Sequence, residues 1–291
     1  MSDDRRDAML EVNVRQQDYY ESRHEAKQAN LGASERAANR ITQGWTSLRR
    51  RIMRMRAAAG VDEYLLDLHR HWLGDLSGKK VLDLGCFDGN VLSLWLAQQA
   101  GEYVGVDLSA SAIDALNRKL EERGLDNARA ETMDFLANPW PDASFDVVYA
   151  YSVMHHFADL DVAVAELRRI LREDGMVVTM DPLKTEPFNR FARAIYRPFQ
   201  TDKAWEFPFD RKALRTFRRY FRVEEQRGIG ALVKFSYPLL VFPGLTPAGR
   251  RVADRLLAFD DEHTRRRSLP FYLAWHVALK LRPLPGGDDA G

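Results

Sequence analysis

Apolar residues change their spacing along the 291-residue chain, and each change marks a predicted element. Over residues 1–78 they recur at intervals of about three and four, which is the period of an amphipathic helix. From residue 79 onward, short apolar runs alternate with helical patterns. Strands buried on both faces of a parallel sheet read as continuous apolar runs, so the alternation predicts strand–helix units. The predicted strands are residues 80–84, 103–107, 128–132, 144–150 and 176–181.

Five such units predict an α/β fold with a doubly wound, mostly parallel sheet, because crossovers between parallel strands are almost always right-handed. Asp174-Gly175 is expected to end the helix before the fifth strand, and Asp210 is a predicted N-cap. The remaining predicted elements are helices over 91–100, 109–122, 159–172, 211–220 and 247–259, and strands over 221–230 and 271–281.

The same pattern predicts how the chain is organised. Residues 1–78 are expected to be a helical extension and residues 79–282 the main domain. Within that domain, residues 183–209 and 231–270 are expected as insertions on the substrate side. The tail from 283 to 291, rich in glycine and aspartate, is expected to be flexible.

The turn after the first strand, Gly85-Cys86-Phe87-Asp88-Gly89-Asn90, is the clearest candidate for a ligand site. Gly85 and Gly89 allow a ligand to approach the backbone at the carboxyl end of the strand, where open α/β sheets bind cofactors. A pyrophosphate site normally reads G-x-G-x-x-G, and this turn lacks two of the three glycines. Asp83 and Asp88 would also repel a phosphate, so a cationic ligand is favoured.

These residues resemble motif I of the class I S-adenosylmethionine-dependent methyltransferases. Phe145-Asp146-Val147-Val148, followed by two histidines, resembles the small-molecule branch of that family, the type 11-like methyltransferases. The resemblance implies a seven-stranded Rossmann-like sheet whose last two strands are antiparallel. It also implies that S-adenosyl-L-methionine is the cofactor. Phe87 stands where a middle glycine is usual, and a bulky residue at positive φ would be strained.

The expected cofactor site follows the strand ends. Asp107 ends the second strand about two dozen residues after Asp83, the spacing at which an acidic residue meets a ribose; the alternative is a turn or N-cap role. By resemblance, Asp134 would bind the adenine amino group and Met133 would pack on the ring. The full expected set is Asp83, Gly85, Cys86, Phe87, Gly89, Asp107, Leu108, Met133, Asp134 and Tyr151.

Candidate catalytic residues follow the fourth and fifth strands. Histidine titrates near neutral pH and can take a proton from a hydroxyl acceptor, so His155 and His156 are candidate bases. Asp181 ends the adjacent strand, and some sugar O-methyltransferases that resemble this chain pair a histidine with an aspartate. We favour His155; the alternative is that both histidines are structural caps. Tyr19 and Tyr20 are expected either to contact substrate from a helical lid or to be core aromatics.

The amino-acid composition limits the classes of binding partner and the cellular compartment. The 43 basic and 42 acidic residues leave a net charge of +1, which argues against nucleic acid. The single cysteine, Cys86, excludes an internal disulfide and fits a reducing compartment. The absence of a signal-like amino terminus and of a membrane-spanning apolar run predicts a cytoplasmic protein, and the lack of a cysteine cluster predicts no metal.

The sequence therefore predicts methyl transfer to a small molecule, at a hydroxyl. The alternative acceptor is a lipid or quinone-like molecule methylated at carbon or nitrogen, with the basic segment 49–56 contacting a membrane surface without insertion. That segment also reads as a solvated helix face. A hypothesis of another kind is a non-catalytic protein that binds S-adenosylmethionine within a larger assembly. Oligomerisation is left open.

Overall fold

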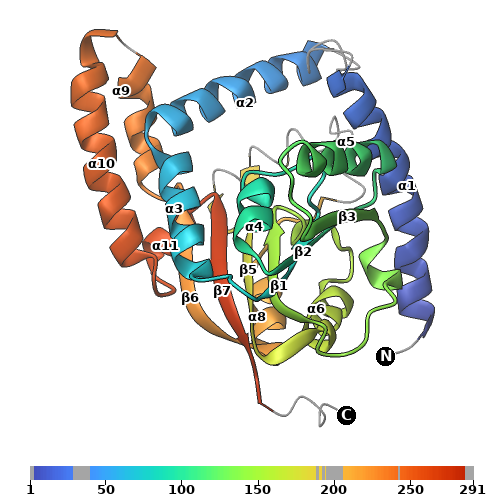
Figure 1. Ribbon diagram of the computed structural model, residues 1–291. Coiled ribbons are helices and arrows are strands. Elements are labelled where there is room, and N and C mark those ends of the chain that lie inside the picture. Colours follow the sequence, from blue (N-terminus) through green and yellow to red (C-terminus); the bar gives the residue numbers. More distant parts are fainter. Residues whose placement is uncertain are drawn as a thin grey trace.

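A computed structural model describes residues 3–28, 40–187, 190–191, 194, 206–241 and 243–285 (Figure 1). The strands form one seven-stranded sheet in the order β3-β2-β1-β4-β5-β7-β6, in which only β7 is antiparallel to its neighbours. The predicted fold class is thereby confirmed. The strands are β1 Lys80–Leu84, β2 Glu102–Asp107, β3 Ala128–Thr132, β4 Phe145–Tyr151, β5 Leu171–Pro182, β6 Phe221–Ile229 and β7 His276–Pro283.

Helices cover both faces of the sheet. Two long amino-terminal helices precede the first sheet-covering helix, and α2 crosses above the sheet in Figure 1. The α-helices are α1 Asp3–Gln28, α2 Arg40–Ala58, α3 Val61–Leu73, α4 Ser93–Gln99, α5 Ala110–Glu121, α6 Leu160–Ile170, α8 Arg211–Tyr220, α9 Tyr237–Val241, α10 Thr246–His263 and α11 Leu269–Leu273. Short 3-10 turns are η1 Phe135–Ala137, η2 Met154–His156, η4 Val233–Ser236 and η5 Pro243–Leu245.

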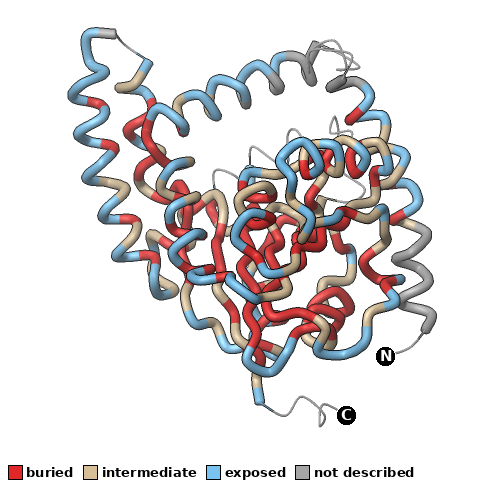
Figure 2. Tube along the Cα trace, viewed as in Figure 1, coloured by how far each residue is buried: buried red, intermediate tan, exposed pale blue. Residues whose placement is uncertain are grey.

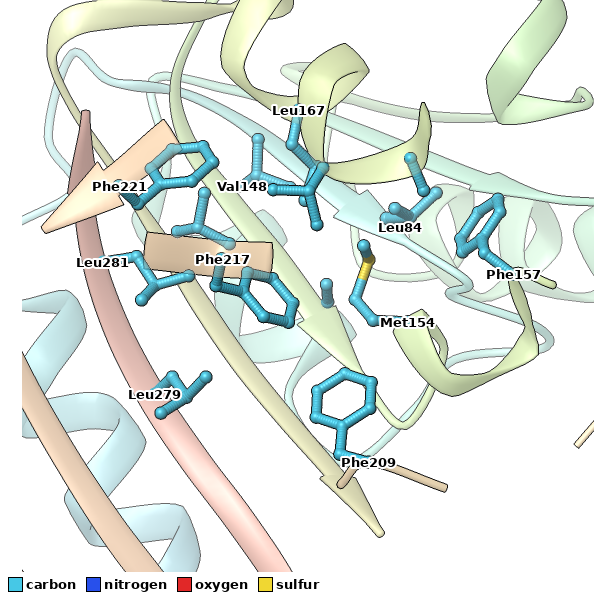
Figure 3. Packing of buried hydrophobic residues seen from close by; sticks show 14 of the residues in the cluster. Leu84, Val148, Met154, Phe157, Leu167, Phe209, Phe217, Phe221, Leu279 and Leu281 are labelled. Atoms are coloured by element: carbon cyan, nitrogen blue, oxygen red, sulfur yellow. The ribbon is translucent and has the colours of Figure 1, made fainter. Parts of the chain in front are cut away.

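Successive side chains of each strand point to opposite faces of the sheet, so a hydrophobic core forms on each face. In β1, Val81 packs with α3, α4 and α5, whereas Leu82 packs with α6, α8 and α11. Figure 3 shows part of the second cluster, in which Phe217 of α8 lies near Leu279 and Leu281 of β7. Figure 2 shows the buried positions concentrated in the strands, while α2 and α10 are largely exposed. Burial on both faces explains the continuous apolar runs.

The start of β5 differs from the prediction. The helix ends at Ile170 and the strand begins at once with Leu171, so Asp174-Gly175 does not end a helix but lies within the strand. The pairing with β4 shifts its register between Phe145 and Val147. A Cβ on Gly175 would lie 2.7 Å from Leu171 Cγ and 2.9 Å from Arg172 O. The glycine therefore permits a close backbone approach at an irregular strand start.

The last strand also begins later than expected. Residues 269–273 form the short helix α11, and β7 starts at His276. Ser268 caps α11 by accepting a hydrogen bond from the Phe271 N–H, and Pro270 occupies the first turn. Both are helix-start signals that the apolar pattern of this segment masked. Likewise α4 begins at Ser93, because Asn90 holds Leu92 in a turn before it.

The predicted cap of α8 is confirmed. The Asp210 carboxylate accepts hydrogen bonds from the Lys212 and Ala213 N–H groups at 2.8 and 3.0 Å. Within the described ranges, none of the helices combines the length and the hydropathy needed to cross a bilayer.

Replacing Asp210 tests how much this cap contributes. Asp210→Ala should lower the free energy of unfolding by about 1 kcal/mol, because two N–H groups of the first turn lose their acceptor. Asp210→Asn, which keeps an acceptor oxygen, should lose much less. Urea unfolding followed by circular dichroism measures both, and equal losses in the two variants would contradict the capping role.

Candidate functional site

The turn after β1 is held by a buried carboxylate. Asp83 is fully buried, and its oxygens accept hydrogen bonds from Asn90 Nδ2 at 3.0 Å, Ser93 Oγ at 2.5 Å and Tyr103 OH at 2.9 Å. Burial raises the pKa of Asp83 to about 6, although the three donors oppose that shift. Asp83 does not line the cavity described below. It fixes the two ends of the turn to each other.

Three residues of the turn, Gly85, Phe87 and Gly89, have positive φ. Gly85 has φ +72°, and a Cβ there would lie 2.7 Å from a methyl group of Val153. Phe87 has φ +50°, so the strain that the sequence suggested is present. The Phe87 ring packs edge-on against His24 and Tyr20 of α1, with ring centroids 5.4 and 6.4 Å apart. The side chain that replaces a glycine therefore joins the turn to α1.

Asp107 lies where β2 ends. Its carboxylate accepts hydrogen bonds from the Phe87 and Ser109 N–H groups, each at 3.0 Å. Burial raises the pKa of Asp107 to about 6 despite these bonds. Ser109, rather than Asp107, is the N-cap of α5, because its hydroxyl accepts from the Ala112 N–H. The N-cap role therefore belongs to Ser109, whereas Asp107 fills the alternative turn role and also lines the cavity.

A cavity of about 370 Å³ opens at the carboxyl ends of β1, β2 and β4. Its volume is within the usual range for small-molecule sites. It combines residues from these strand ends, from the segments that follow β3 and β4, and from α1. Its lining consists of Asn13, Gln16, Tyr20, Arg23, Leu84, Gly85, Phe87, Asn90, Val106, Asp107, Leu108, Met133, Asp134, Phe135, Ser152, Val153, His155, His156, Phe157 and Glu206.

Helix α1 covers this cavity through polar side chains. Asn13 Nδ2 donates to both carboxylate oxygens of Asp134, at 3.0 and 2.8 Å. Gln16 Nε2 donates to the His156 carbonyl at 3.2 Å, and Glu21 accepts from the Ser109 hydroxyl at 2.7 Å. Positions 13 and 16 share one helix face with position 20. Over residues 12–25, the part of α1 whose side chains are described, the helix is thus attached by hydrogen bonds and ring contacts rather than by a continuous apolar stripe.

The predicted histidine–aspartate pair is present in the structure. His155 Nδ1 lies 2.9 Å from Asp181 Oδ1, and the His155 N–H donates to the same oxygen at 3.0 Å. The other oxygen accepts from the Thr179 hydroxyl at 2.5 Å. An ionised carboxylate only accepts hydrogen bonds, so the proton is assigned to Nδ1, which leaves Nε2 of His155 as an acceptor. Asp181 is fully buried, and His155 lines the cavity.

His156 has a different neighbour. Its Nε2 lies 2.9 Å from the Tyr20 hydroxyl, and its ring lies edge-on to the Tyr20 ring. The His155 and His156 ring centroids are 4.0 Å apart. Tyr19 does not line the cavity, but packs edge-on against Tyr20. The two histidines therefore differ in partner: one pairs with a strand-end carboxylate, the other with the covering helix.

Four residues of the expected cofactor set lie outside the cavity lining. Gly89 lies in the turn and Asp83 in β1, and neither belongs to the lining. Cys86 is fully buried, and burial followed by nearby carboxylates raises the pKa of its thiol well above the usual value. Tyr151 lies on the opposite face of β4, stacked on Tyr149 and edge-on to His69. The direct contact expected from Tyr151 is not supported, because residues 149 and 151 share the face that turns toward α3.

The two residues that follow Tyr151 line the cavity at the position where Tyr151 was expected. Ser152, at φ +58°, and Val153 line the cavity instead. Sequence reasoning also missed Asn13 and Gln16 of α1 and Asn90 of the turn. A signal for the first two was present, since buried polar residues at 13 and 16 lie on the face of Tyr20.

The lining chemistry suits S-adenosylmethionine better than a dinucleotide. Among the described lining residues, Arg23 is the only lysine or arginine, whereas Asp107 and Asp134 supply carboxylates. Carboxylates accept hydrogen bonds from ribose hydroxyls and an adenine amino group, and they repel phosphate. In the described ranges, no group of three or more His, Cys, Asp or Glu side chains converges as a metal site.

The raised pKa of Asp107 predicts a pH dependence of binding. Hydroxyls that donate to the carboxylate stabilise its ionised form, so binding of S-adenosylhomocysteine should lower that pKa from about 6. Affinity should therefore weaken as the pH falls below about 6 and be level above it. Asp107→Asn should weaken binding by about 1–3 kcal/mol at neutral pH and remove this slope. Calorimetry between pH 5 and 8 measures both, and an unchanged slope in the variant would remove Asp107 from the ribose role.

The chain matches known proteins over its central part. Residues 82–179 match the family model described as "Methyltransferase domain". The demethylmenaquinone methyltransferase of Thermus thermophilus is 37% identical over 105 residues, which are 35% of this chain and 47% of that protein. The phthiotriol/phenolphthiotriol dimycocerosates methyltransferase of Mycobacterium tuberculosis is 30% identical over 158 residues, covering 54% and 52%. The chain thus spans about half the length of these relatives.

A solved structure agrees in fold. The geranyl diphosphate C-methyltransferase of Streptomyces coelicolor, crystallised with S-adenosyl-L-homocysteine, superposes with a TM-score of 0.54 at 15% identity, covering 77% of this chain and 81% of that one. Residues 82–179 thus match a methyltransferase domain. The strand order and the acidic strand ends agree with the class I S-adenosylmethionine-dependent type.

Proposed function

We propose that the protein transfers a methyl group from S-adenosylmethionine to a hydroxyl of a small molecule, with His155 as general base. The observation that carries the proposal is the 2.9 Å contact between His155 Nδ1 and Asp181 Oδ1 at the edge of the cavity. Asp181 fixes the ring and its tautomer, which leaves Nε2 free to accept a proton. Thr179 in turn holds the second oxygen of Asp181.

The cofactor supplies an activated methyl group, so the protein must position the acceptor and exclude water. In this proposal Asp107 binds the ribose hydroxyls, Asp134 the adenine amino group, and the turn around Gly85 the amino-acid end. Met133 and Phe135, which also line the cavity, contribute apolar surface for the adenine ring. Asp83 acts indirectly, by holding the turn.

Residues 1–78 act in this proposal as a helical lid on the domain formed by residues 79–282. Support comes from α1, which reaches the candidate base region through Tyr20 and the candidate adenine region through Asn13. The proposed insertion 183–209 also reaches the cavity, since Glu206 belongs to its lining. Much of that insertion, and the tail from residue 286, lie outside the described residues.

Removing the base tests the proposal. His155→Ala should lower turnover by about 10²–10⁴-fold, the usual contribution of a general base, while the affinity for S-adenosylhomocysteine stays the same. Asp181→Asn should lower turnover less and alter its pH profile, because the favoured tautomer changes. Transfer of a labelled methyl group to a panel of hydroxylated and quinol acceptors measures turnover, and calorimetry measures affinity.

The matched control is His71→Ala, since His71 lies on α3 outside the cavity lining. Unchanged turnover in His155→Ala would exclude a base at this position and favour an acceptor that needs none. Tight binding of the cofactor without transfer to any acceptor would support a non-catalytic binding protein instead.

A second candidate function is methylation of a lipid or quinone-like acceptor. The relatives named above act, by their names, on demethylmenaquinone and on phthiotriol dimycocerosates. On α2, Arg50, Met53 and Arg54 are exposed and share one face, whereas Ile52 and Met55 pack inward against the core. A cationic face with an apolar residue suits the surface of an anionic bilayer.

The helix that packs on α2 also ends in exposed apolar residues. Val241, at the end of α9, is 59% exposed, and Leu245, in the following turn, is 46% exposed. These apolar side chains add to the support for peripheral contact with lipid.

Vesicle flotation tests this second candidate. The protein should float with phosphatidylglycerol vesicles at low salt, and Arg50→Gln/Arg54→Gln should weaken that association by about 1 kcal/mol for each arginine. Arg118→Gln/Arg255→Gln removes the same charge from exposed positions on α5 and α10 and should have little effect. Equal flotation of all three proteins would exclude a membrane role for α2.

A further inference from the structure

A second polar cavity lies away from the cofactor site. It has a volume of about 350 Å³ and lies between the end of α8, the start of β6 and the turn that follows α10. Because β6 runs parallel to β1 and begins here, the cavity lies toward the opposite edge of the sheet from the proposed methyl-transfer site. Its lining consists of Arg218, Val223, Glu224, Gln226, Arg265, Arg266 and Arg267, none of which lines the cofactor cavity. We call it the arginine pocket.

Positive charge in the arginine pocket is poorly compensated. Among the described lining residues Glu224 alone is acidic, and it already pairs with Arg282 at 2.8 Å and Lys280 at 3.6 Å. Within the described part of the chain, Arg218 and Arg266 form no ion pair with a carboxylate, and both are exposed at the rim. Four arginine side chains therefore line one concavity, and among the described residues two of them, Arg218 and Arg266, have no carboxylate partner.

Arg267 lies deepest in this group. Its Nε is buried, and among the described residues that atom has no hydrogen-bond partner. Its Nη2 donates to the Leu214 carbonyl at 3.3 Å, and its guanidinium also interacts with the Tyr272 hydroxyl. Burial, followed by the positive charges of Arg218 and Arg215, lowers the pKa of Arg267. The neighbouring arginines thus disfavour the positive charge of this partly buried side chain, and a bound anion would offset that repulsion.

Structural roles account for only part of the cluster. Arg265 pairs with Asp261 at 2.7 Å, one helical turn earlier. Arg218 occupies the last turn of α8, where a cation favours the helix dipole. Neither role explains why Arg266 and Arg267 are brought to the same concavity, against mutual repulsion.

We propose that the arginine pocket binds a multivalent oxyanion of the phosphate class. Guanidinium groups are planar and donate in pairs, which matches the oxygens of a phosphate or diphosphate. The ligand is either a free phosphate compound or the phosphate headgroup of a lipid, and both have the same recognition chemistry. The site is separate from the cofactor cavity and does not depend on the proposed methyl transfer.

Calorimetry with pyrophosphate at constant ionic strength tests the site. Wild-type protein should bind pyrophosphate saturably, with the same affinity in the presence of saturating S-adenosylhomocysteine, because that compound occupies the other cavity. Arg218→Gln/Arg266→Gln removes two exposed lining cations and should weaken binding at least about tenfold, the loss expected for charge-assisted hydrogen bonds. Arg118→Gln/Arg255→Gln, with the same net charge, should bind as wild type.

A parallel measurement identifies the source of the phosphate. Phosphatidylcholine vesicles that contain phosphatidic acid should retain the wild-type protein more than Arg218→Gln/Arg266→Gln if the ligand is a lipid headgroup. Binding of pyrophosphate without vesicle retention supports a free ligand. The proposal is overturned if neither probe binds, if both double variants lose binding equally, or if S-adenosylhomocysteine displaces pyrophosphate.

Discussion

The buried carboxylate of Asp83 is the interaction on which the site depends. It ties together the end of β1, the turn through Asn90 and the start of α4 through Ser93. Without these donors, a carboxylate so far from water would be costly, and its pKa of about 6 shows that the cost is only partly offset. The turn it fixes carries Gly85 and Phe87, whose left-handed conformations shape the floor of the cavity.

Helix α1, which covers the cavity, is held by a different kind of interaction from the one that holds the turn. Helix α1 is attached by hydrogen bonds that Asn13 and Gln16 donate and that Glu21 accepts, and by ring contacts with Phe87. Polar contacts of this kind exchange with water at little net cost, whereas separating an apolar interface exposes surface that water disfavours. A helix held in this way is suited to move when ligands enter and leave. Its contact with Asp134 occupies the carboxylate proposed for adenine, so α1 and the cofactor would share that group.

Aromatic residues connect the two halves of the site. Tyr20 contacts both Phe87 of the turn and His156 after β4. His155, the neighbour of His156, is held by Asp181 of β5. The candidate base is therefore oriented by the sheet, while its neighbour His156 contacts α1, the proposed lid. The proposed base, His155, is thus held separately from Tyr20 and His156, which lie where α1 covers the cavity.

Much of the fold could be predicted from local patterns. Strands buried on both faces can be recognised as apolar runs in the sequence. Short stretches of sequence also predict β3, the cap of α8 and the strand-end positions of Asp107 and Asp181. The beginnings of β5 and β7 could not, because a register shift at Gly175 and a capped turn at Ser268 depend on neighbours in space. Whether a residue at a strand end faces the cavity or the core was decided by the pleat, which turned Tyr151 away and exposed Ser152. The sequence by itself determined which strands form and which acidic residues and histidines follow each of them. Only the tertiary structure decided that His155 meets Asp181, that α1 reaches Asp134, and that four arginines converge at the far edge, since each joins segments that no local interaction links.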